Sequence, residues 1–302
     1  MVRRARFVGL RQWLFIGIAA IALCVASIAR AEPGLWVVKG ARSTIYLFGT
    51  VHTLRKDQPW ASPQVAKALA ESDELWLEIP DPEDTRAAQA LIAQFGFDRQ
   101  HPLSTKLPAS DIAHLDAAAK SVGLRDGEKT FEPTRPWLAS VMLEDAMLVH
   151  AGYDSAGGVE RQLLREANRT GKPVRGFETL DQQIRIFADM PPATEVQLLQ
   201  NTLQDFDQGA AKLDALVAAW LEGDDVALAR IMVDEIRQPF PALYRTILVD
   251  RNEAFAAALT RLVAGSGVKF VAVGAAHLAG TDSVQVALKR HGIAVQRITR
   301  PN

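Results

Sequence analysis

Two histidines of this chain stand in the same local pattern. His52 ends the segment GTVH and His277 ends the segment GAAH, and in both cases a run of β-forming residues leads directly into Gly-x-x-His. A glycine at the end of a strand permits a sharp turn and leaves room for a ligand beside the imidazole. Each histidine alone would more often be a hydrogen-bonded structural residue, so it is the repeated setting that indicates a site.

Two glutamates occupy equivalent positions. Glu78 lies near the end of the apolar run 75–79, and Glu178 follows the β-forming run 173–177. A carboxylate buried at such a place is costly unless it has a partner. Because ligands of open α/β sheets bind outside the carboxyl ends of the strands, we expect these carboxylates and the two histidines at one edge of a sheet.

This set of side chains predicts a metal centre. Two imidazoles with one or two carboxylates suit a divalent metal (Zn²⁺, Mn²⁺ or Co²⁺) with a coordination position left open for water. Glu78 is then either the third ligand or the general base that takes the proton of the water, and both roles stay open. Arg251, on a late helix, would hold an anion or pair with a site carboxylate, with a solvated helix face as the alternative. The remaining histidines are expected on the surface: His101, His114, His150 and His291.

The elements that must position these residues divide by their place in the chain. Strands are expected over 36–39, 44–48, 75–79, 173–177, 269–273 and 293–298. Strands at both ends of the chain must share one sheet, because neither set could cover itself alone. The sequence therefore predicts an α/β (α+β) fold, in which a central mixed β-sheet is formed by N- and C-terminal strands around a largely helical middle insertion.

The middle of the chain has helical periodicity. It covers about 103–147 and, almost without a break, 180–262. Residues 154–169 are predicted to form an amphipathic helix whose apolar face is Val159, Leu163, Leu164 and Ala167.

The first 31 residues are predicted to be a signal peptide. Several arginines precede the apolar run 13–28, and Ala29-Arg30-Ala31 has the small-x-small pattern of a cleavage site. The apolar run has 16 residues, short of the roughly 20 that a spanning helix needs; a retained anchor is the alternative. We expect cleavage after Ala31, a periplasmic or secreted location, one α/β domain over 32–302, and no stable membrane span after cleavage.

Composition and missing motifs exclude several classes of protein. The 302 residues are 48% hydrophobic and 23% charged, with a net charge of -1, which excludes disordered chains and gives no electrostatic basis for binding nucleic acid. Cys24 is the one cysteine and lies in the predicted signal peptide, so thiolate chemistry is excluded from the mature chain. His-Glu-x-x-His, Gly-x-Ser-x-Gly, Gly-x-Gly-x-x-Gly and Walker-type motifs are absent.

With these residues in place, the sequence resembles the TraB/PrgY/GumN family. The resemblance lies in six stretches that run in family order from about residue 34 to the C-terminus: LFGTVH (47–52), LWLE (75–78), GYDS (152–155), GFETLDQQ (176–183), RN (251–252) and VGAAHLAG (273–280). The family is similar to the Tiki-type membrane-associated metalloproteases and, more distantly, to erythromycin-esterase-like and ChaN-like proteins.

The resemblance implies an α/β core with both Gly-x-x-His motifs at a shared site, and peptidase activity in the Tiki branch. His52 and His277 match the motif histidines and Glu78 matches the acidic residue. Further polar family positions are matched by Asp154, Glu178 and Arg251.

Two functional hypotheses follow. The first is a secreted or periplasmic metal-dependent hydrolase, above all a peptidase, that acts on a peptide or small-molecule substrate through the two histidines and the glutamate. The second is a non-catalytic binding protein that sequesters a small ligand or a peptide, in the manner that the resemblance to pheromone-shutdown and haem-binding proteins implies. A nucleic-acid partner is expected for neither.

Overall fold

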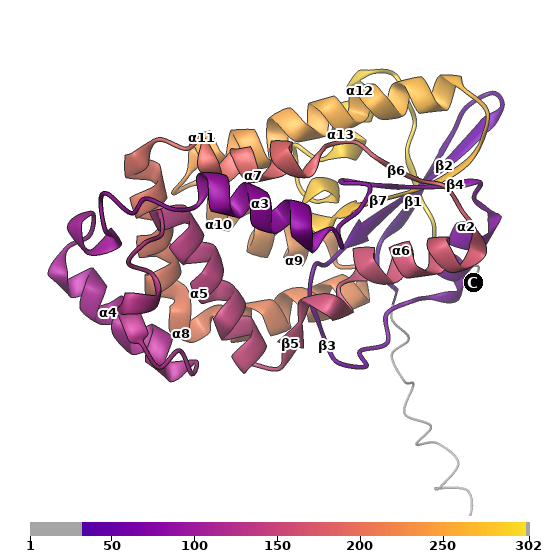
Figure 1. Cartoon of the computed structure of the whole chain (residues 1–302). Coiled ribbons are helices and arrows are strands. Elements are labelled where there is room, and N and C mark those ends of the chain that lie inside the picture. Colours follow the sequence, from indigo (N-terminus) through magenta and orange to yellow (C-terminus); the bar gives the residue numbers. More distant parts are fainter. Residues whose placement is uncertain (1–31, 300–302) are drawn as a thin grey trace, which may run out of the picture. The chain divides into compact units, whose positions relative to one another are not determined.

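The structure is a computed structural model that describes residues 32–299 (Figure 1). The predicted signal peptide and its cleavage site lie outside these residues, as do residues 300–302 of the predicted domain. In the part of the chain that is described, no helix is both long and apolar enough to cross a membrane.

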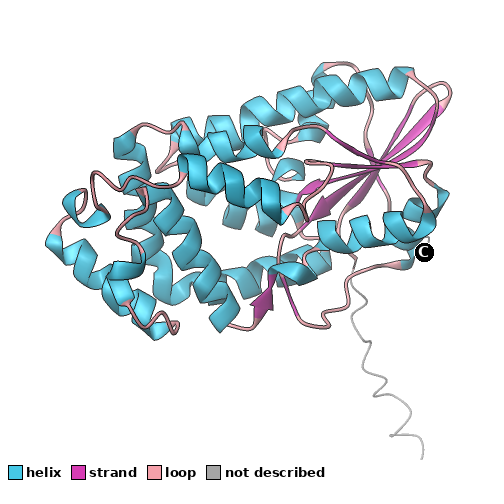
Figure 2. Ribbon diagram, viewed as in Figure 1, coloured by secondary structure: helices cyan, strands magenta, loops and turns pink. Residues whose placement is uncertain are grey.

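A six-stranded mixed sheet contains strands from both ends of the chain, in the order β6-β4-β7-β2-β1-β8. The bounds of its strands are β1 Leu35–Lys39, β2 Ser43–Thr50, β4 Glu74–Leu77, β6 Val174–Gly176, β7 Gly267–Gly274 and β8 Gln296–Arg297. The predicted fold class, a mixed sheet with a helical middle region, is confirmed (Figure 2).

Four adjacent strands of this sheet run parallel. β2 pairs with β7, β7 with β4, and β4 with β6, whereas β1 is antiparallel to both β2 and β8. The register of β2 and β7 ends with Gly49 opposite Val273 and Thr50 opposite Gly274. Because the two Gly-x-x-His motifs begin within this last part of the register, they leave the sheet side by side.

Both faces of the sheet are buried. In β7, Phe270 and Ala272 belong to one apolar cluster and Val271 and Val273 belong to another, as the alternation of a strand requires. The first cluster is shared with α2 (Pro63–Glu71), α6 (Val159–Thr170) and the end of α8 (Pro192–Glu222), and the second with α12 (Asp250–Ala264) and α13 (Val284–Arg290). Figure 1 shows α6 and α12 on opposite sides of the strands.

The helical middle region packs around the long helix α8. Leu143 of α5 (Pro136–His150), Leu115 of α4 (Ala109–Ser121) and Leu199 of α8 lie in one buried cluster. The remaining helices have the bounds α3 Thr85–Phe95, α7 Leu180–Ala188, α9 Asp225–Leu228, α10 Glu235–Arg237 and α11 Pro241–Tyr244, with π-helical turns at Ala229–Asp234 and Arg245–Val249.

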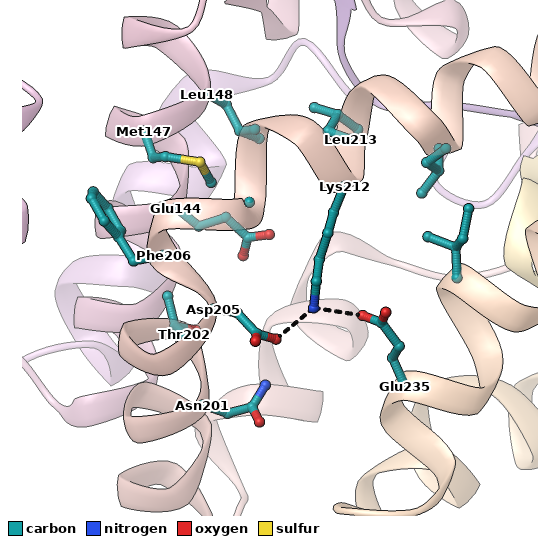
Figure 3. A pocket seen from close by; sticks show the side chains of 13 residues that line it. Glu144, Met147, Leu148, Asn201, Thr202, Asp205, Phe206, Lys212, Leu213 and Glu235 are labelled. Atoms are coloured by element: carbon teal, nitrogen blue, oxygen red, sulfur yellow. Dashed lines mark hydrogen bonds and ion pairs between the residues drawn. The ribbon is translucent and has the colours of Figure 1, made fainter.

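A cavity of about 240 Å³ lies between α5, α8 and the segment that leads into α10 (Figure 3). Lys212 crosses it and forms ion pairs with Asp205 at 2.9 Å and Glu235 at 3.2 Å. None of the residues predicted to do chemistry lines this cavity.

The observed strands begin or end within two residues of their predicted bounds, and two elements differ by more than that. The helix expected over 154–169 begins only at Val159, because the Asp154 carboxylate accepts a hydrogen bond from the Ala156 N–H (2.8 Å) and closes a local turn instead of capping a helix. Asp154 itself belongs to β5 (Tyr153–Asp154), which pairs with β3 (Leu54–Arg55) in a separate two-stranded sheet. The last strand is limited to Gln296–Arg297, since only these residues pair with β1.

Candidate active site

Parallel strands bring four of the predicted residues to one edge of the sheet. His52 follows β2, Glu78 follows β4, Glu178 follows β6, and His277 lies in the 3-10 turn that follows β7. Arg251 reaches this edge from the first turn of α12. The contacts below join all five.

Glu78 lies at the centre of the site and is 9% exposed. Its Oε1 accepts the Gly274 N–H at 2.7 Å, and its Oε2 accepts from Arg251 Nη2 at 2.6 Å and from Gln183 Nε2 at 2.9 Å. Burial alone would raise the pKa of this carboxyl, but the Arg251 and His52 cations and the hydrogen bond from the Gly274 N–H lower the pKa below its ordinary value. Since Arg251 keeps its charge throughout, Glu78 is ionised.

Arg251 bridges the two site glutamates. Its Nε and Nη2 donate to the two oxygens of Glu178 at 2.8 and 2.7 Å, while Nη2 also reaches Glu78. Its Nη1 donates to the Ile247 carbonyl in the π-helical turn before α12. Gln183 of α7 donates to Glu178 as well as to Glu78, at 3.1 Å. For Arg251 we considered anion binding, pairing with a site carboxylate, and a place on a solvated helix face. In the structure, Arg251 pairs with the two site carboxylates.

His277 is buried and held in one orientation. It is 3% exposed, and its Nδ1 lies 2.5 Å from Asn252 Oδ1. Because Asn252 Nδ2 donates to the Asp282 carbonyl at 2.7 Å, the amide oxygen faces the ring, and we assign the proton to Nδ1. Burial lowers the pKa of His277 to about 4. The neutral ring thus keeps a free lone pair on Nε2, which lies 3.6 Å from Glu78 Oε1.

His52 is held in the same way but faces solvent. Its side chain is 74% exposed, and its Nδ1 lies 2.8 Å from Oε1 of Glu160, which also accepts the Thr50 hydroxyl. The Glu160 carboxylate raises the pKa of His52 to about 9. Glu160 itself is buried at 9% exposure, and the charge of His52 lowers its pKa against the effect of burial.

The space above Gly274 is common to these side chains. A Cβ atom built on this glycine would lie 3.2 Å from Glu78 Oε1, 3.6 Å from His52 Nε2 and 3.7 Å from His277 Cδ2. The glycine that begins the second motif therefore leaves open a space that a carboxylate and two imidazoles surround. A cavity of about 220 Å³ opens beside it, lined by His52, Leu77, Glu78, Ile79, Pro82, Glu160, Arg161 and Gln183.

The donor types at this site fit a divalent metal in part. Each imidazole has its Nδ1 held by an oxygen acceptor, as metal-binding histidines do. Because the pKa of His277 is lowered and that of His52 is raised, Nε2 of His277 has a free lone pair, whereas Nε2 of His52 carries a proton that a metal ion would have to displace. The oxygens of Glu78 already accept three hydrogen bonds. Over residues 32–299, no three or more His, Cys, Asp or Glu side chains are grouped so as to hold a metal ion. His277 Nε2 is a nitrogen donor in place, His52 Nε2 becomes one when it loses its proton, and these residues hold no third protein ligand in place.

Asp154 is the candidate that lies apart from this network. It is exposed on β5, its carboxylate accepts from the Ala156 N–H, and none of its described contacts involves the other candidates. The four histidines expected on the surface are exposed: His101, His114, His150 and His291.

Glu160 was not among the predicted site residues. The helical spacing of Glu160 with Leu163, Leu164 and Ala167 places its carboxylate on the buried face of α6, and a glutamate on an apolar face is a recognisable signal of a polar partner. Gln183 and Asn252 carry no comparable signal, because a single amide on a helix is ordinary.

Comparisons with known proteins give a family for this chain. A model of the TraB/PrgY/gumN family matches residues 34–297, which contain every strand of the main sheet and every site residue described above. An uncharacterized protein of Treponema pallidum (strain Nichols) is 22% identical over 273 residues, covering 85% of this chain and 80% of the relative.

Proposed function

We propose, from the premise that this chain belongs to the TraB/PrgY/gumN family, that it is a metal-dependent hydrolase that cleaves peptides. One observation carries the proposal: both imidazoles are held through Nδ1, His52 by Glu160 and His277 by Asn252, so that Nε2 of each ring, at His52 after loss of its proton, is the nitrogen that would bind the ion beside Glu78. Such preorganised nitrogen donors next to a carboxylate suit the hydrolysis of an acyl bond.

Each residue has a role in this proposal. His52 and His277 would hold the ion, Zn²⁺, Mn²⁺ or Co²⁺, which when bound lowers the pKa of water to roughly 7. Glu78 either completes the ligand set or takes the proton of the attacking water. The hydrogen bonds from Gly274, Arg251 and Gln183 keep Glu78 ionised and fix its orientation for either role.

The peptide substrate rests on the resemblance to the Tiki-type metalloproteases and on the shape of the cavity. Leu77, Ile79 and Pro82 form an apolar wall beside His52 and Glu78. A wall of this kind suits the apolar side chain of a residue that lies next to the scissile bond.

The test is metal analysis of the purified mature protein, together with a screen for peptide hydrolysis. We expect close to one bound ion per chain, and we expect both the ion and hydrolysis to be lost in His52→Ala and His277→Ala. His150→Ala is the matched control, because His150 is exposed at the end of α5. Unchanged metal content in both site variants would rule out the metal centre.

A non-catalytic binding protein is the second candidate, and one observation favours it. Glu78 already accepts three hydrogen bonds, and the described residues offer no third ligand in place. In that case native mass spectrometry of the purified protein would detect a retained ligand, and no peptide of the screen would be cleaved.

We further propose that the protein is exported and that Ala31 is the last residue removed. An apolar run of 16 residues followed by Ala29-Arg30-Ala31 supports cleavage over anchoring. The intact mass of protein recovered from the exporting cell should correspond to a chain that begins at Glu32. A full-length chain that needs detergent for its recovery would contradict this.

A further inference from the structure

We propose that Arg161 makes this site selective for substrates that carry a carboxylate. The inference rests on the proposed function, since it names the class of peptide that the cavity beside His52 would accept. Arg161 would bind the carboxylate of an acidic side chain or of a peptide C-terminus.

The position of Arg161 is the first observation. It follows Glu160, whose carboxylate holds His52, and it lines the same cavity as His52 and Glu78. The residue is half-buried in the first turn of α6. Among the residues that line this cavity, Arg161 is the one lysine or arginine.

The second observation is that Arg161 has no ion-pair partner within residues 32–299, in contrast to the later arginines of the same helix. Arg165 pairs with Glu83 at 3.1 Å, and Arg169 pairs with Glu166 at 2.6 Å. A guanidinium has five N–H donors in a planar fork that matches a carboxylate. Those of Arg161 are therefore available to a ligand in the cavity.

The charges around the cavity restrict where that ligand can place an anion. Glu78 and Glu160 also line the cavity, where Glu78 pairs with Arg251 at 2.6 Å and Glu160 with His52 at 2.8 Å, and a second carboxylate beside either of them would be repelled. Because His52 and Arg251 already have carboxylate partners, Arg161 is the cation at this cavity, within the described residues, that is left to pair with a carboxylate of the ligand. Because Arg161 attracts a carboxylate and the two glutamates repel it, the cavity selects substrates by the position at which they carry an acidic group. The apolar wall of Leu77, Ile79 and Pro82 adds a preference for an adjacent apolar side chain.

The experiment separates binding from turnover. The full chain, exported and purified, is incubated with acetylated pentapeptides in matched pairs, and captured peptides are counted by affinity-selection mass spectrometry. One set of pairs differs by Glu against Gln at a single position, and the other by a C-terminal acid against its amide. EDTA is present, so that neither hydrolysis nor carboxylate–metal contacts contribute.

We expect the protein to capture the acidic members of one set about tenfold or more over their neutral partners, as a charge-assisted hydrogen bond provides. If the preference appears in the Glu/Gln pairs, the bound carboxylate is that of a side chain; if it appears in the acid/amide pairs, it is that of the peptide C-terminus. Arg161→Gln should bring the ratio close to one and Arg161→Lys should keep part of it. Arg169→Gln, the matched change at the far end of α6, should leave it unchanged.

Two results would overturn the inference: capture without preference for the acid by the unmodified protein, or an unchanged ratio in Arg161→Gln. Hydrolysis is measured separately, with Zn²⁺ or Mn²⁺ added. This second measurement distinguishes failure of the carboxylate selectivity from failure of the proposed hydrolase function. Selective capture without cleavage would contradict the hydrolase alone and support the inference. Cleavage without selective capture would contradict the inference alone.

Discussion

The Glu160 carboxylate sets the charge of His52, and this can be measured without any substrate. It stabilises the imidazolium, so the pKa of His52 is raised to about 9. Glu160→Gln keeps an acceptor for Nδ1 but removes the charge, and the pKa should fall toward the ordinary value of about 6.5, a drop of about one unit or more. NMR titration of the His52 ring reports it. Glu166→Gln, which affects only the surface pair with Arg169, should leave the titration unchanged; a fall of equal size there would contradict this account.

Gly274 tests whether the space between the imidazoles is functional. Its φ of -50° suits any L-residue, so Gly274→Ala introduces a methyl group without backbone strain. That methyl group would lie 3.2 Å from Glu78 Oε1 and 3.6 Å from His52 Nε2. We expect loss of metal binding and of hydrolysis, with the unfolding free energy lowered by less than about 1.5 kcal/mol.

The matched control for this substitution is Gly157→Ala, whose Cβ would have ordinary contacts, the nearest 3.5 Å from the Leu54 carbonyl. Metal content and thermal unfolding are measured for both variants, to show whether the space above Gly274 is needed for metal binding. Full metal binding in Gly274→Ala would show that the ion does not need this space.

At the level of single residues, the sequence located the strand-end histidines and glutamates because each follows a recognisable β-run. It did not locate what holds them. The Asn252 amide and the Gln183 amide become site residues only because α12 and α7 pack across the strand ends, a tertiary fact that has no local pattern. Asp154 shows the converse: its polar position satisfies a local turn and does not join the site.

At the scale of elements, the N-terminus of α7 holds Gln183 in place. Thr179 and Gln182 form a capping box, in which the Thr179 hydroxyl accepts the Gln182 N–H and the Gln182 side chain accepts the Thr179 N–H. Thr179→Ala should lower the free energy of unfolding in urea by about 1 kcal/mol. Thr170→Ala is the control, because that hydroxyl only bonds back to carbonyls of its own helix. Equal effects of the two would contradict a capping role.

Helix and strand types could be predicted more securely than their bounds or hydrogen-bonding patterns. The apolar face of α6 was predicted correctly, while its start was placed at Asp154 in place of Val159. The π-helical turn Arg245–Val249 was predicted only as helix, because a shift of one residue in hydrogen bonding leaves the apolar spacing nearly unchanged. Yet this turn supplies the Ile247 carbonyl that helps to orient Arg251.

For the molecule as a whole, apolar strands at both ends of the chain were enough to predict one shared sheet. They were not enough to predict its order. In a strand that is buried on both faces, all side chains are apolar, and the sequence has no pattern that identifies the neighbouring strands. From burial alone, β7 could have been placed at several positions in the sheet. The structure places it between β2 and β4, where it joins the two Gly-x-x-His motifs and Glu78.

This central place of β7 predicts how the chain tolerates truncation. A chain that ends at residue 265 lacks the strand that pairs with both β2 and β4, and it loses Phe270 and Val271, which fill the cores on opposite faces of the sheet. The same truncation removes Val273, Leu278, Val284 and Leu288 from the core. Burial of each of these six side chains contributes about 1.5–3 kcal/mol, which together is comparable to a whole domain's stability of about 5–15 kcal/mol. We expect no cooperative thermal transition and no near-UV circular dichroism from this chain.

A chain that ends at residue 294 is the control, because the one strand that it lacks is β8, an edge strand that pairs with β1 at two positions, and the apolar side chains lost with it, Val295 and Ile298, are only partly buried. It should unfold cooperatively at a lower temperature and keep His277 in its native contacts with Asn252. The two truncations therefore separate an interior strand from an edge strand in the same sheet. A cooperative transition in the shorter chain would mean that the N-terminal strands form a core without β7, and that the sheet is not one folding unit.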